Sequence, residues 1–383
     1  MSPQLHPSPF ESARLIVLKL GSAVLTTGGG ELDISVMTQI CEEIAELLKR
    51  GRKVVLVTSA AVAAGRSALG VKDRKPTIAV KQALAAVGQT RLMQIYTELF
   101  ARHGVIVGQM LLSRSDMEDR RRYVNARYTL EELLRRECVP IINENDTVTV
   151  DELRFGDNDG LAAIVAVKMQ ADALLLLSDV DGLYDSNPKL NKNARLLEHI
   201  DRITPAMLDA AEDGHVKGAA QLGSGGMTSK VQAAQVATTA GVCVAIAHGK
   251  RQRVLHEILS GQFHGTFFTA EPCRHTRRRQ WILAGKTAGR RVIVDEGARE
   301  ALVAKKKSLL PAGVHSIEGE FQPQDLVDIV DARGNILGRG VINYSSQELQ
   351  RIKGRKTADI ESILGSKPYD EAIHRDNLAL NDV

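Results

Sequence analysis

Between residues 15 and 260, short aliphatic runs alternate with longer stretches whose hydrophobic residues recur every three or four positions. The runs predict buried strands, and the spaced stretches predict amphipathic helices. The expected strands are 15–20, 53–58, 105–112, 139–142, 173–177 and 242–247. The expected helices are 34–50, 61–69, 77–103, 123–137, 162–169, 230–240 and 254–259. Strands that are apolar on both faces and separated by helices predict an α/β fold with a mostly parallel sheet sandwiched by helices.

After residue 285 the hydrophobic runs shorten and turn glycines follow them. Four of these runs have the two-residue alternation of strands, at 291–294, 316–319, 326–330 and 336–340. This change of pattern predicts a second, small β-rich domain. The expected divisions are a disordered N-terminal segment (1–13), the large α/β domain (14–270), a basic linker (271–285) and the small β-rich domain (286–375).

The composition is typical of a globular protein. The chain has 383 residues, of which 44% are hydrophobic and 25% charged, and its net charge of +4 is too small to indicate a polyanionic partner. Every aliphatic run, 173–177 among them, is too short to span a bilayer, and the first residues lack the apolar core of a signal peptide. The four cysteines are far apart and have no metal-binding spacing. We therefore expect a cytoplasmic protein without membrane contact.

Five clusters of small, polar or glycine residues follow predicted strands or begin predicted helices, where parallel α/β folds bind ligands. In the first cluster, 17–30, Lys19 precedes a glycine-containing loop; in the fifth, 223–230, a glycine run precedes Lys230. Backbone N–H groups of such loops and helix starts can hold an anion, to which lysine adds a charge. Two lysines from distant segments suit phosphoryl transfer, which depends on positioning and electrostatic stabilisation. Either cluster by itself is also compatible with an ordinary strand-to-helix loop.

The other three clusters carry small, amide and acidic side chains. They are TSAAVAAG (58–65), INENDTVTV (142–150) together with FGDNDG (155–160), and LLSDVDGLYDSNP (176–188). Polar groups beside buried strands cost free energy unless they bind something. Asn and Asp can hold the ammonium group of an amino acid, and Asp can orient a metal–phosphate complex. Solvated turns remain the alternative for each loop taken alone.

The five clusters, in this order, resemble the glutamate 5-kinases of the amino-acid kinase family, over residues 14–375. The most specific segments are 107–127, 142–146, 156–159, 182–188 and 225–230; segments 294–298, 308–314, 338–346 and 374–377 resemble a PUA domain. The resemblance implies the amino-acid kinase fold and the ATP-dependent phosphorylation of L-glutamate to L-glutamyl 5-phosphate, which begins proline synthesis. It also implies a Mg²⁺ requirement, feedback inhibition by proline and a homo-oligomer, either a dimer or a tetramer. The labile product raises the idea of a glutamyl-phosphate reductase as a partner.

Transferred position by position, the resemblance implies a role for each candidate residue. The implied catalytic residues are Lys19, Lys230, Asp157 and Asp159, the lysines stabilising the phosphoryl group and the aspartates organising substrate, Mg²⁺ and lysines. The implied glutamate-binding residues are Ser59, Asn143, Asp146 and Asn158. The implied ATP-binding residues are Lys19, Ser178, Asp179, Ser224, Gly225, Gly226, Met227, Thr228, Ser229 and Lys230. No direct protein ligand to a metal ion is assigned.

One position in the second cluster departs from the family pattern. Ala60 stands where the family usually has glycine. The Cβ of alanine would obstruct a backbone with positive φ or the close approach of a ligand. We therefore expect activity to survive with an altered KM.

Three other interpretations remain open. A related kinase could act on acetylglutamate or aspartate, although the β-rich tail differs from the regulatory module of aspartate kinases. An RNA-binding protein could use the basic segments 274–279 and 305–307, but no interleaved aromatic residues accompany them, which argues against RNA. A catalytically weak regulatory homologue is disfavoured because Lys19, Asp159 and Lys230 are retained.

Overall fold

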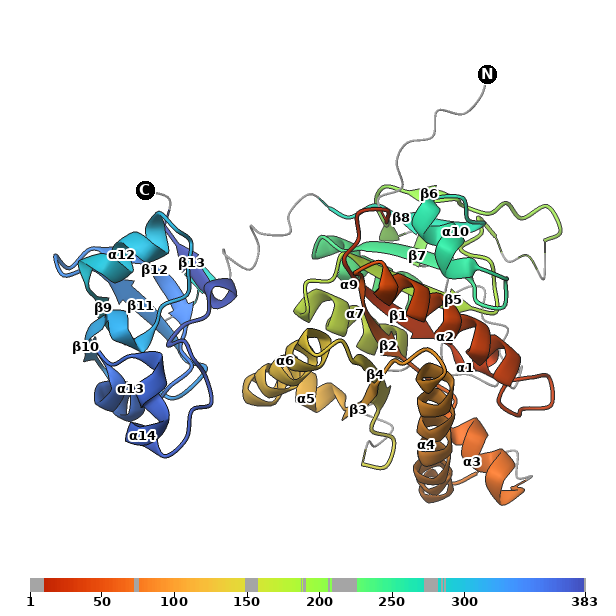
Figure 1. The fold of residues 1–383 in the computed structure, drawn as a ribbon. Helices are drawn as coiled ribbons and strands as arrows, with labels where there is room; N and C mark the ends of the chain where they lie inside the picture. The colour runs from red at the N-terminus through yellow and green to blue at the C-terminus, as the bar shows by residue number, and fades with distance from the viewer. Residues whose placement is uncertain are drawn as a thin grey trace. The chain divides into compact units, whose positions relative to one another are not determined.

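The chain divides into two compact units, Met1–Pro272 and Cys273–Val383 (Figure 1). The structure is a computed structural model. It describes residues 10–71, 76–148, 158–186, 188, 191–205, 207–208, 226–271, 282–283, 285 and 287–381.

The first unit is built on an eight-stranded sheet with the order β3-β4-β2-β1-β5-β7-β8-β6. Neighbouring strands are parallel except for β7 and β8. The strands are β1 (Leu15–Leu20), β2 (Lys53–Val57), β3 (Val107–Leu112), β4 (Val139–Glu144), β5 (Ala173–Ser178), β6 (His199–Ile200), β7 (Cys243–His248) and β8 (Gly265–Phe268). The mostly parallel sheet predicted from the aliphatic runs is confirmed; β6 and β8 were not predicted.

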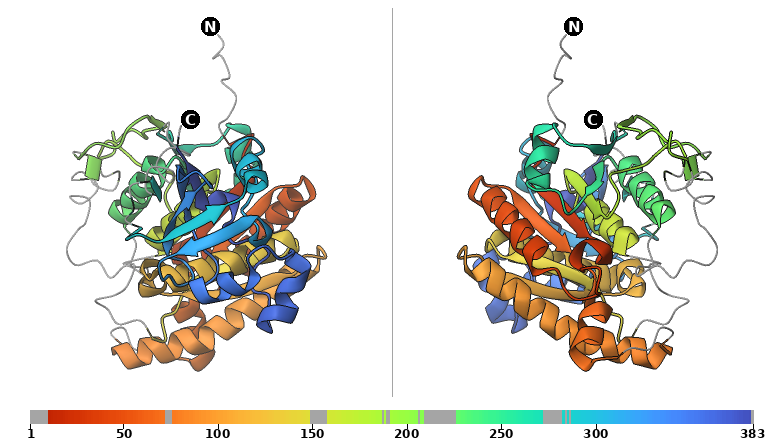
Figure 2. Two further views of the ribbon diagram at one scale, coloured as in Figure 1. Left: turned by 90° about the vertical axis from the view of Figure 1, so that its left-hand side faces the viewer. Right: turned by 90° about the vertical axis from the view of Figure 1, so that its right-hand side faces the viewer.

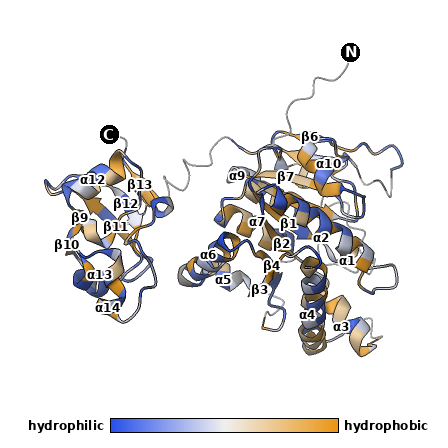
Figure 3. Ribbon diagram, in the orientation of Figure 1, coloured by the Kyte–Doolittle hydropathy of each residue, from blue (hydrophilic) through white to orange (hydrophobic). Residues whose placement is uncertain are grey.

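Helices cover both faces of this sheet, as the views of Figures 1 and 2 show. They are α1 (Ser22–Leu25), α2 (Ile34–Lys49), α3 (Ala61–Leu69), α4 (Ile78–Ala101), α5 (Arg114–Glu118), α6 (Arg120–Arg135), α7 (Asn158–Lys168), α9 (Met227–Thr239) and α10 (Val254–Ser260). One hydrophobic core lies between the sheet and α2, α4 and α10, and a second lies between the sheet and α6, α7 and α9. Figure 3 shows the hydrophobic residues along α7, which is buried in the second core.

The alternation of side chains along a strand decides which core each residue enters. In β1, Ile16 and Leu18 belong to the core under α2, whereas Val17 belongs to the core under α7. Lys19 is two residues beyond Val17 and therefore lies on the α7 side. The sequence thus places a lysine at the carboxyl end of a central strand, on the face that α7 and α9 cover.

Helices α3 and α4 pack against each other at very short range and extend together away from the sheet (Figure 1). Two glycines permit this approach. A Cβ on Gly65 would lie 1.9 Å from the carbonyl oxygen of Leu84, and a Cβ on Gly88 would lie 1.8 Å from that of Ala61. Both distances are far below van der Waals contact, so only glycine fits at either position.

The sequence predicts disorder for residues 1–13, and the structure describes the chain from residue 10 onward. Phe10 is buried and packs edge to face against Phe263 and Phe267, with ring centroids 6.4 and 5.3 Å apart. An aromatic side chain buried in this way anchors the backbone around it. Residues 10–13 are therefore part of the folded unit, while residues 1–9 lie outside the described residues.

The second unit is a five-stranded sheet, in the order β10-β9-β11-β12-β13, around its own hydrophobic core. Its strands are β9 (Arg291–Val294), β10 (Val314–Glu318), β11 (Leu326–Val330), β12 (Ile336–Val341) and β13 (Leu378–Leu380). The α-helices whose bounds lie within its described residues are α12 (Glu296–Val303), α13 (Ser346–Ile352) and α14 (Ile360–Leu364). The small β-rich domain is confirmed, and the three helices are additional to the prediction. In the described part of the chain, no helix combines the length and hydrophobicity of a transmembrane span.

A buried carboxylate in the first unit joins α2 to α10. Glu43 is 8% exposed, and its Oε2 accepts hydrogen bonds from the backbone N–H groups of Leu255 and His256, at 2.8 and 3.2 Å. Burial raises the pKa of Glu43 above its ordinary value, although these N–H donors act in the opposite direction. The loss of hydration therefore outweighs the stabilisation of the carboxylate by the start of α10.

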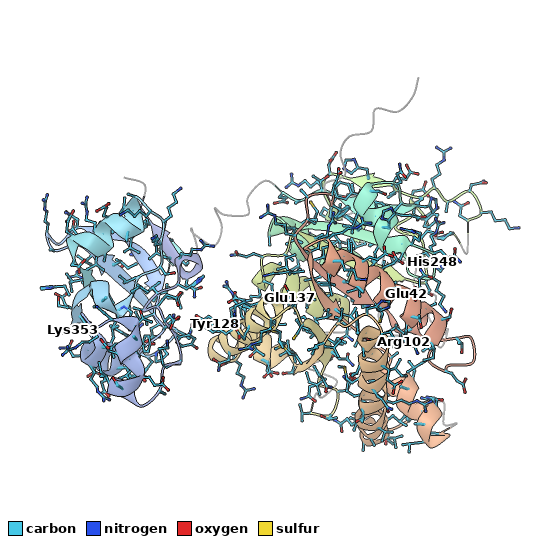
Figure 4. The ribbon with its side chains drawn as sticks, in the orientation of Figure 1. Glu42, Arg102, Tyr128, Glu137, His248 and Lys353 are labelled. Carbon is cyan, nitrogen blue, oxygen red and sulfur yellow. The ribbon has the colours of Figure 1, made fainter. Side chains whose placement is uncertain are left out.

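This raised pKa makes the stability of the protein depend on pH. The folded chain holds the proton of Glu43 more tightly than the unfolded chain, so its contribution is largest at low pH and is lost as the pH rises through the folded-state pKa. We expect the unfolding free energy of the wild type, relative to Glu43→Gln, to fall as the pH rises above about 4.3, the ordinary pKa of glutamate, as measured by urea unfolding. Glu42→Gln, on the exposed side of α2 (Figure 4), is the control and should show no such trend. A difference that stays constant over this range would contradict the prediction.

Candidate active site

The predicted site residues lie at the carboxyl ends of four neighbouring strands, β4, β2, β1 and β5. Asn143 is the penultimate residue of β4, Ser59 follows β2, Lys19 is the penultimate residue of β1 and Ser178 ends β5. This edge of a parallel sheet is where ligands bind in such folds. The starts of α7 and α9 supply Asn158, Asp159, Ser229 and Lys230.

Asp159 lies between the two predicted lysines. It pairs with Lys19, and its Oδ2 lies 3.1 Å from Lys230 Nζ and accepts a hydrogen bond of 3.2 Å from Ser229 Oγ. Lys19, Asp159 and Lys230 are 4%, 0% and 5% exposed. Two cations and one anion leave this buried trio with a net positive charge, which suits an anionic ligand. Burial strengthens the effect because water screens it less.

The three residues of this trio come together because two helices begin beside one strand. Asp159 is in the first turn of α7 and Lys230 is in the first turn of α9, and the two helices pack against each other on the face toward which Lys19 points. A helix start carries partial positive charge and N–H groups that the helix itself does not satisfy. Both helix starts therefore add to the attraction that the lysines exert on an anion.

Beside the trio is a cluster of amide side chains centred on Asn158. Asn158 Nδ2 donates to the carbonyl oxygen of Thr58 at 2.7 Å, to Ser59 Oγ at 3.0 Å and to Asn143 Oδ1 at 2.9 Å. Asn143 Nδ2 in turn donates to Gln89 Oε1 at 2.8 Å. Within the described chain, the buried Oδ1 of Asn158 accepts no hydrogen bond. An acceptor held in this way suits a ligand that brings a donor, such as an ammonium group.

The end of β5 supplies the residues predicted for the nucleotide. Ser178 is 4% exposed, and its hydroxyl donates to Asp179 Oδ1 at 3.1 Å. Asp179 itself is exposed beyond the strand. Ser178 lies opposite His248, which ends β7 (Figure 4). The hydroxyl and carboxylate therefore stand at the rim of the sheet, two strands from Ser59.

The other predicted residues differ in how they lie relative to these groups. Asp146 lies in a half-buried turn after β4 and is not among the groups that bind Asn158. Gly226 caps α9, and Met227 and Thr228 form its first turn with Ser229. Three predicted residues, Asp157, Ser224 and Gly225, lie outside the described residues.

Sequence reasoning missed the contribution of α4. Gln89 binds Asn143, and the hydroxyl of Tyr96 lies 2.9 Å from that of Thr58. Tyr96 is fully buried, which raises the pKa of its hydroxyl and keeps it protonated. One signal in the sequence was available. Gln89 lies three residues before Leu92 and seven before Tyr96, and this spacing places all three on one face of a helix.

Ala60 has the left-handed backbone that glycine adopts most easily. Its φ is +75° and its ψ is 11°, at the position preceding α3, and the residue is 7% exposed. The conformation strains an alanine by about 1–2 kcal/mol. The methyl group is nevertheless accommodated in the core under α2 and α4.

Two substitutions test the strain at position 60. Ala60→Gly relieves it but also loses a buried methyl group and loosens the unfolded chain, so we expect stability to change by less than about 1 kcal/mol. Ala60→Val places a β-branched residue in this conformation and should cost about 2–3 kcal/mol. Urea unfolding measures both. A valine variant as stable as the glycine variant would show that the conformation relaxes without cost, and unchanged kinetics in Ala60→Gly would show that the methyl group does not affect the reaction.

The described residues do not form a ready-made metal cluster. Among them, no group of three or more His, Cys, Asp or Glu side chains is suited to hold a metal ion. The buried carboxylate of Asp159 is already paired with two lysines. A magnesium ion bound to the phosphates of a nucleotide would bring ligands of its own.

The fold and the charged site are those of an α/β phosphotransferase: two buried lysines and two helix starts meet at one edge of a mostly parallel sheet, with Asp159 between the lysines. Residues 14–248 match the sequence profile of the amino acid kinase family, and residues 290–364 match that of the PUA domain. The chain belongs to the amino acid kinase family.

Several relatives are similar over almost their whole length, and each is called glutamate 5-kinase. The protein from Syntrophotalea carbinolica is 48% identical over 371 residues, covering 97% of this chain and 98% of its own. The proteins from Myxococcus xanthus and Thermoanaerobacter sp. (strain X514) are 46% and 45% identical, covering 97% and 95% of this chain and 97% of each relative. Among solved structures, UMP kinase from Bacillus anthracis covers 68% of this chain and 97% of its own, with a TM-score of 0.45 and 15% identity.

Proposed function

We propose that this protein is a glutamate 5-kinase, which transfers the γ-phosphoryl group of ATP to the γ-carboxylate of L-glutamate. The observation that carries the proposal is the buried trio of Lys19, Asp159 and Lys230 beside the amide cluster of Asn158. The first group suits a transferring phosphoryl group, and the second suits an amino acid. The relatives called glutamate 5-kinase support the same substrate.

The reaction needs no general base. The γ-carboxylate of glutamate has an ordinary pKa of about 4.3 and is ionised at neutral pH. One of its oxygens forms a bond to the γ-phosphorus, the bond from that phosphorus to the β-phosphate oxygen breaks, and ADP leaves with the bonding electrons. No proton is transferred in this step, so charge stabilisation and alignment are the main tasks of the protein.

The lysines provide the charge stabilisation. Lys19 and Lys230 approach from different elements, and their shared partner Asp159 fixes both ammonium groups without neutralising them. The starts of α7 and α9 add their N–H groups on the same side. Because all of these groups are in place before the substrates arrive, little reorganisation is needed in the transition state.

The amide cluster provides the alignment of the acid. Asn158, held by Thr58, Ser59 and Asn143, presents its carbonyl oxygen to the ammonium group of glutamate. The same proposal assigns Asp146 as a further partner of the ammonium group. It assigns Asp157 as a residue that organises the substrates. ATP would lie along residues 224–230, Ser178 and Asp179, and Mg²⁺ bound to its phosphates would reduce their negative charge.

The proposal includes further properties of location, assembly, regulation and partner. A cytoplasmic location, a homo-oligomer of two or four subunits and feedback inhibition by proline belong to the proposal. The acyl phosphate product is labile in water, so a glutamyl-phosphate reductase that receives it promptly is a reasonable partner.

The proposal is tested by measuring ADP release with Mg·ATP and L-glutamate, with hydroxylamine present to trap the acyl phosphate as a hydroxamate. Aspartate and N-acetylglutamate are parallel substrates, and proline is tested as an inhibitor. We expect turnover and hydroxamate only with glutamate. Turnover with another acid alone would retain the phosphotransferase and overturn the substrate. Folded protein that turns over none of the acids would overturn the proposed function.

A further inference from the structure

Helix α4 reaches the amide cluster from the opposite face of the sheet. Gln89, Leu92 and Tyr96 lie on one stripe of this helix and are 8%, 0% and 0% exposed. Alternation along the strands directs Thr58 and Asn143 to the same face, since each follows a residue of the core under α7, Val57 and Ile142. The stripe on α4 therefore supports the two residues that hold Asn158.

Backbone groups fix the orientation of the amides in this cluster, because a backbone N–H can only donate a hydrogen bond and a backbone carbonyl oxygen can only accept one. The backbone N–H of Glu144 donates to Asn143 Oδ1 at 2.9 Å, so Asn143 must turn its NH₂ group toward Gln89. Gln89 must then present its carbonyl oxygen to Asn143. The carbonyl oxygen of Thr58 accepts from Asn158 Nδ2, which turns Asn158 Oδ1 away from the cluster.

This arrangement leaves one donor and one acceptor without partners. In the described part of the chain, the buried Gln89 Nε2 has no hydrogen-bond acceptor and the buried Asn158 Oδ1 has no donor. Leaving such a group unpaired costs free energy, so a buried polar group without a partner calls for a ligand, an ion or a water molecule to complete it. Both side chains bind the same residue, Asn143, so one hydrogen-bonded chain of three amides links the two groups.

We propose that Gln89 binds the acid substrate directly, with its Nε2 donating a hydrogen bond to a carboxylate oxygen of the amino acid. An acceptor at Asn158 and a donor at Gln89 together complement a zwitterion, which carries an ammonium group beside a carboxylate. Gln89 thereby also orients Asn143 through its carbonyl oxygen. The inference rests on the proposed function and adds a specificity-determining residue from α4.

Two substitutions separate substrate binding from support of Asn143. Gln89→Met has a similar volume and removes both the donor and the acceptor. Gln89→Glu keeps an acceptor for Asn143 but sets a carboxylate against the carboxylate of the substrate. We expect the KM for the acid to rise about tenfold in Gln89→Met and about a hundredfold or more in Gln89→Glu. The KM for Mg·ATP should stay within about twofold of wild type in both variants, because the lysine trio is unchanged.

Gln94→Met is the matched control, because Gln94 is an exposed glutamine on the same helix and should leave both KM values unchanged. A Gln89→Glu variant with a milder defect than Gln89→Met would show that Gln89 serves only to orient Asn143, and would overturn the proposal. An unchanged KM for the acid in Gln89→Met would overturn it as well.

The change in melting temperature on adding the acid provides a second readout that needs no turnover. We expect the wild type and Gln94→Met to be stabilised by the acid, and Gln89→Met to be stabilised less at the same concentration. If the wild type uses an acid other than glutamate, the assignment of glutamate as the substrate is wrong. The same comparison with that acid then still tests the role of Gln89. If no acid stabilises or reacts with the wild type, the proposed function fails and this inference fails with it.

Discussion

Replacing Lys230 with methionine is expected to lower kcat for glutamyl phosphate formation by about a thousandfold or more. Methionine retains most of the length of the side chain, so the variant should remain folded. In the proposed mechanism it removes one of the two cations that stabilise the transferring phosphoryl group, and an arginine with this role contributes about 10³–10⁵ to the rate in other phosphoryl-transfer enzymes. Asp159 keeps Lys19 as a partner, so the charge that remains buried is balanced.

Hydroxamate formation under saturating glutamate and Mg·ATP measures this effect. The control is Lys49→Met, which removes an exposed lysine at the end of α2, on the other face of the sheet. It should retain full activity. If kcat for Lys230→Met stayed within about tenfold of wild type, Lys230 would not stabilise the transition state and the proposed mechanism would be wrong.

Replacing Asp159 with alanine is expected to remove activity and, in addition, to destabilise the first unit by about 3–5 kcal/mol. Asp159 is fully buried, and it balances two lysines that are themselves almost fully buried. Removal of one partner of a buried ion pair leaves an uncompensated charge, which is the costly case. Urea unfolding and the hydroxamate assay measure the two effects separately.

A triple variant distinguishes the two roles of Asp159. Combining Asp159→Asn with Lys19→Met and Lys230→Met removes every charge of the trio, and such neutral replacements often cost little stability or even increase it. We expect this variant to unfold close to the wild-type midpoint and to have no activity. A stable Asp159→Ala single variant would contradict the view that the carboxylate balances the lysines, and a triple variant as unstable as Asp159→Ala would contradict it as well.

The strands of the first unit were predictable because their hydrophobicity follows from burial on both faces. The runs at 15–20 and 173–177 became β1 and β5 within one residue. Helix ends were less predictable. The predicted helix at 162–169 begins four residues earlier, at Asn158, and it is this early start that brings Asn158 and Asp159 into the site.

Lys19 and Lys230 could be singled out from the sequence, but their arrangement could not. Lys19 at a strand end and Lys230 after a glycine run have local signals, because strand ends and glycine-rich helix starts bind anions wherever they occur. No local signal shows that a single carboxylate bridges the two lysines, which are 211 positions apart in the chain. That contact depends on α7 and α9 packing side by side.

The sequence by itself determined the alternating strands and helices, the two-domain division and the residue types that the chemistry needs. These properties are local, because side-chain alternation, helix periodicity and loop composition depend on neighbours a few residues apart. Only the tertiary structure decided that Gln89 and Tyr96 of α4 support the amide cluster, that Glu43 contacts the start of α10 and that Ala60 adopts a positive φ. A buried polar side chain on a helix has the same local pattern whatever it contacts. Its partner is selected by packing between segments far apart in the chain, where an unpaired buried group would cost too much free energy.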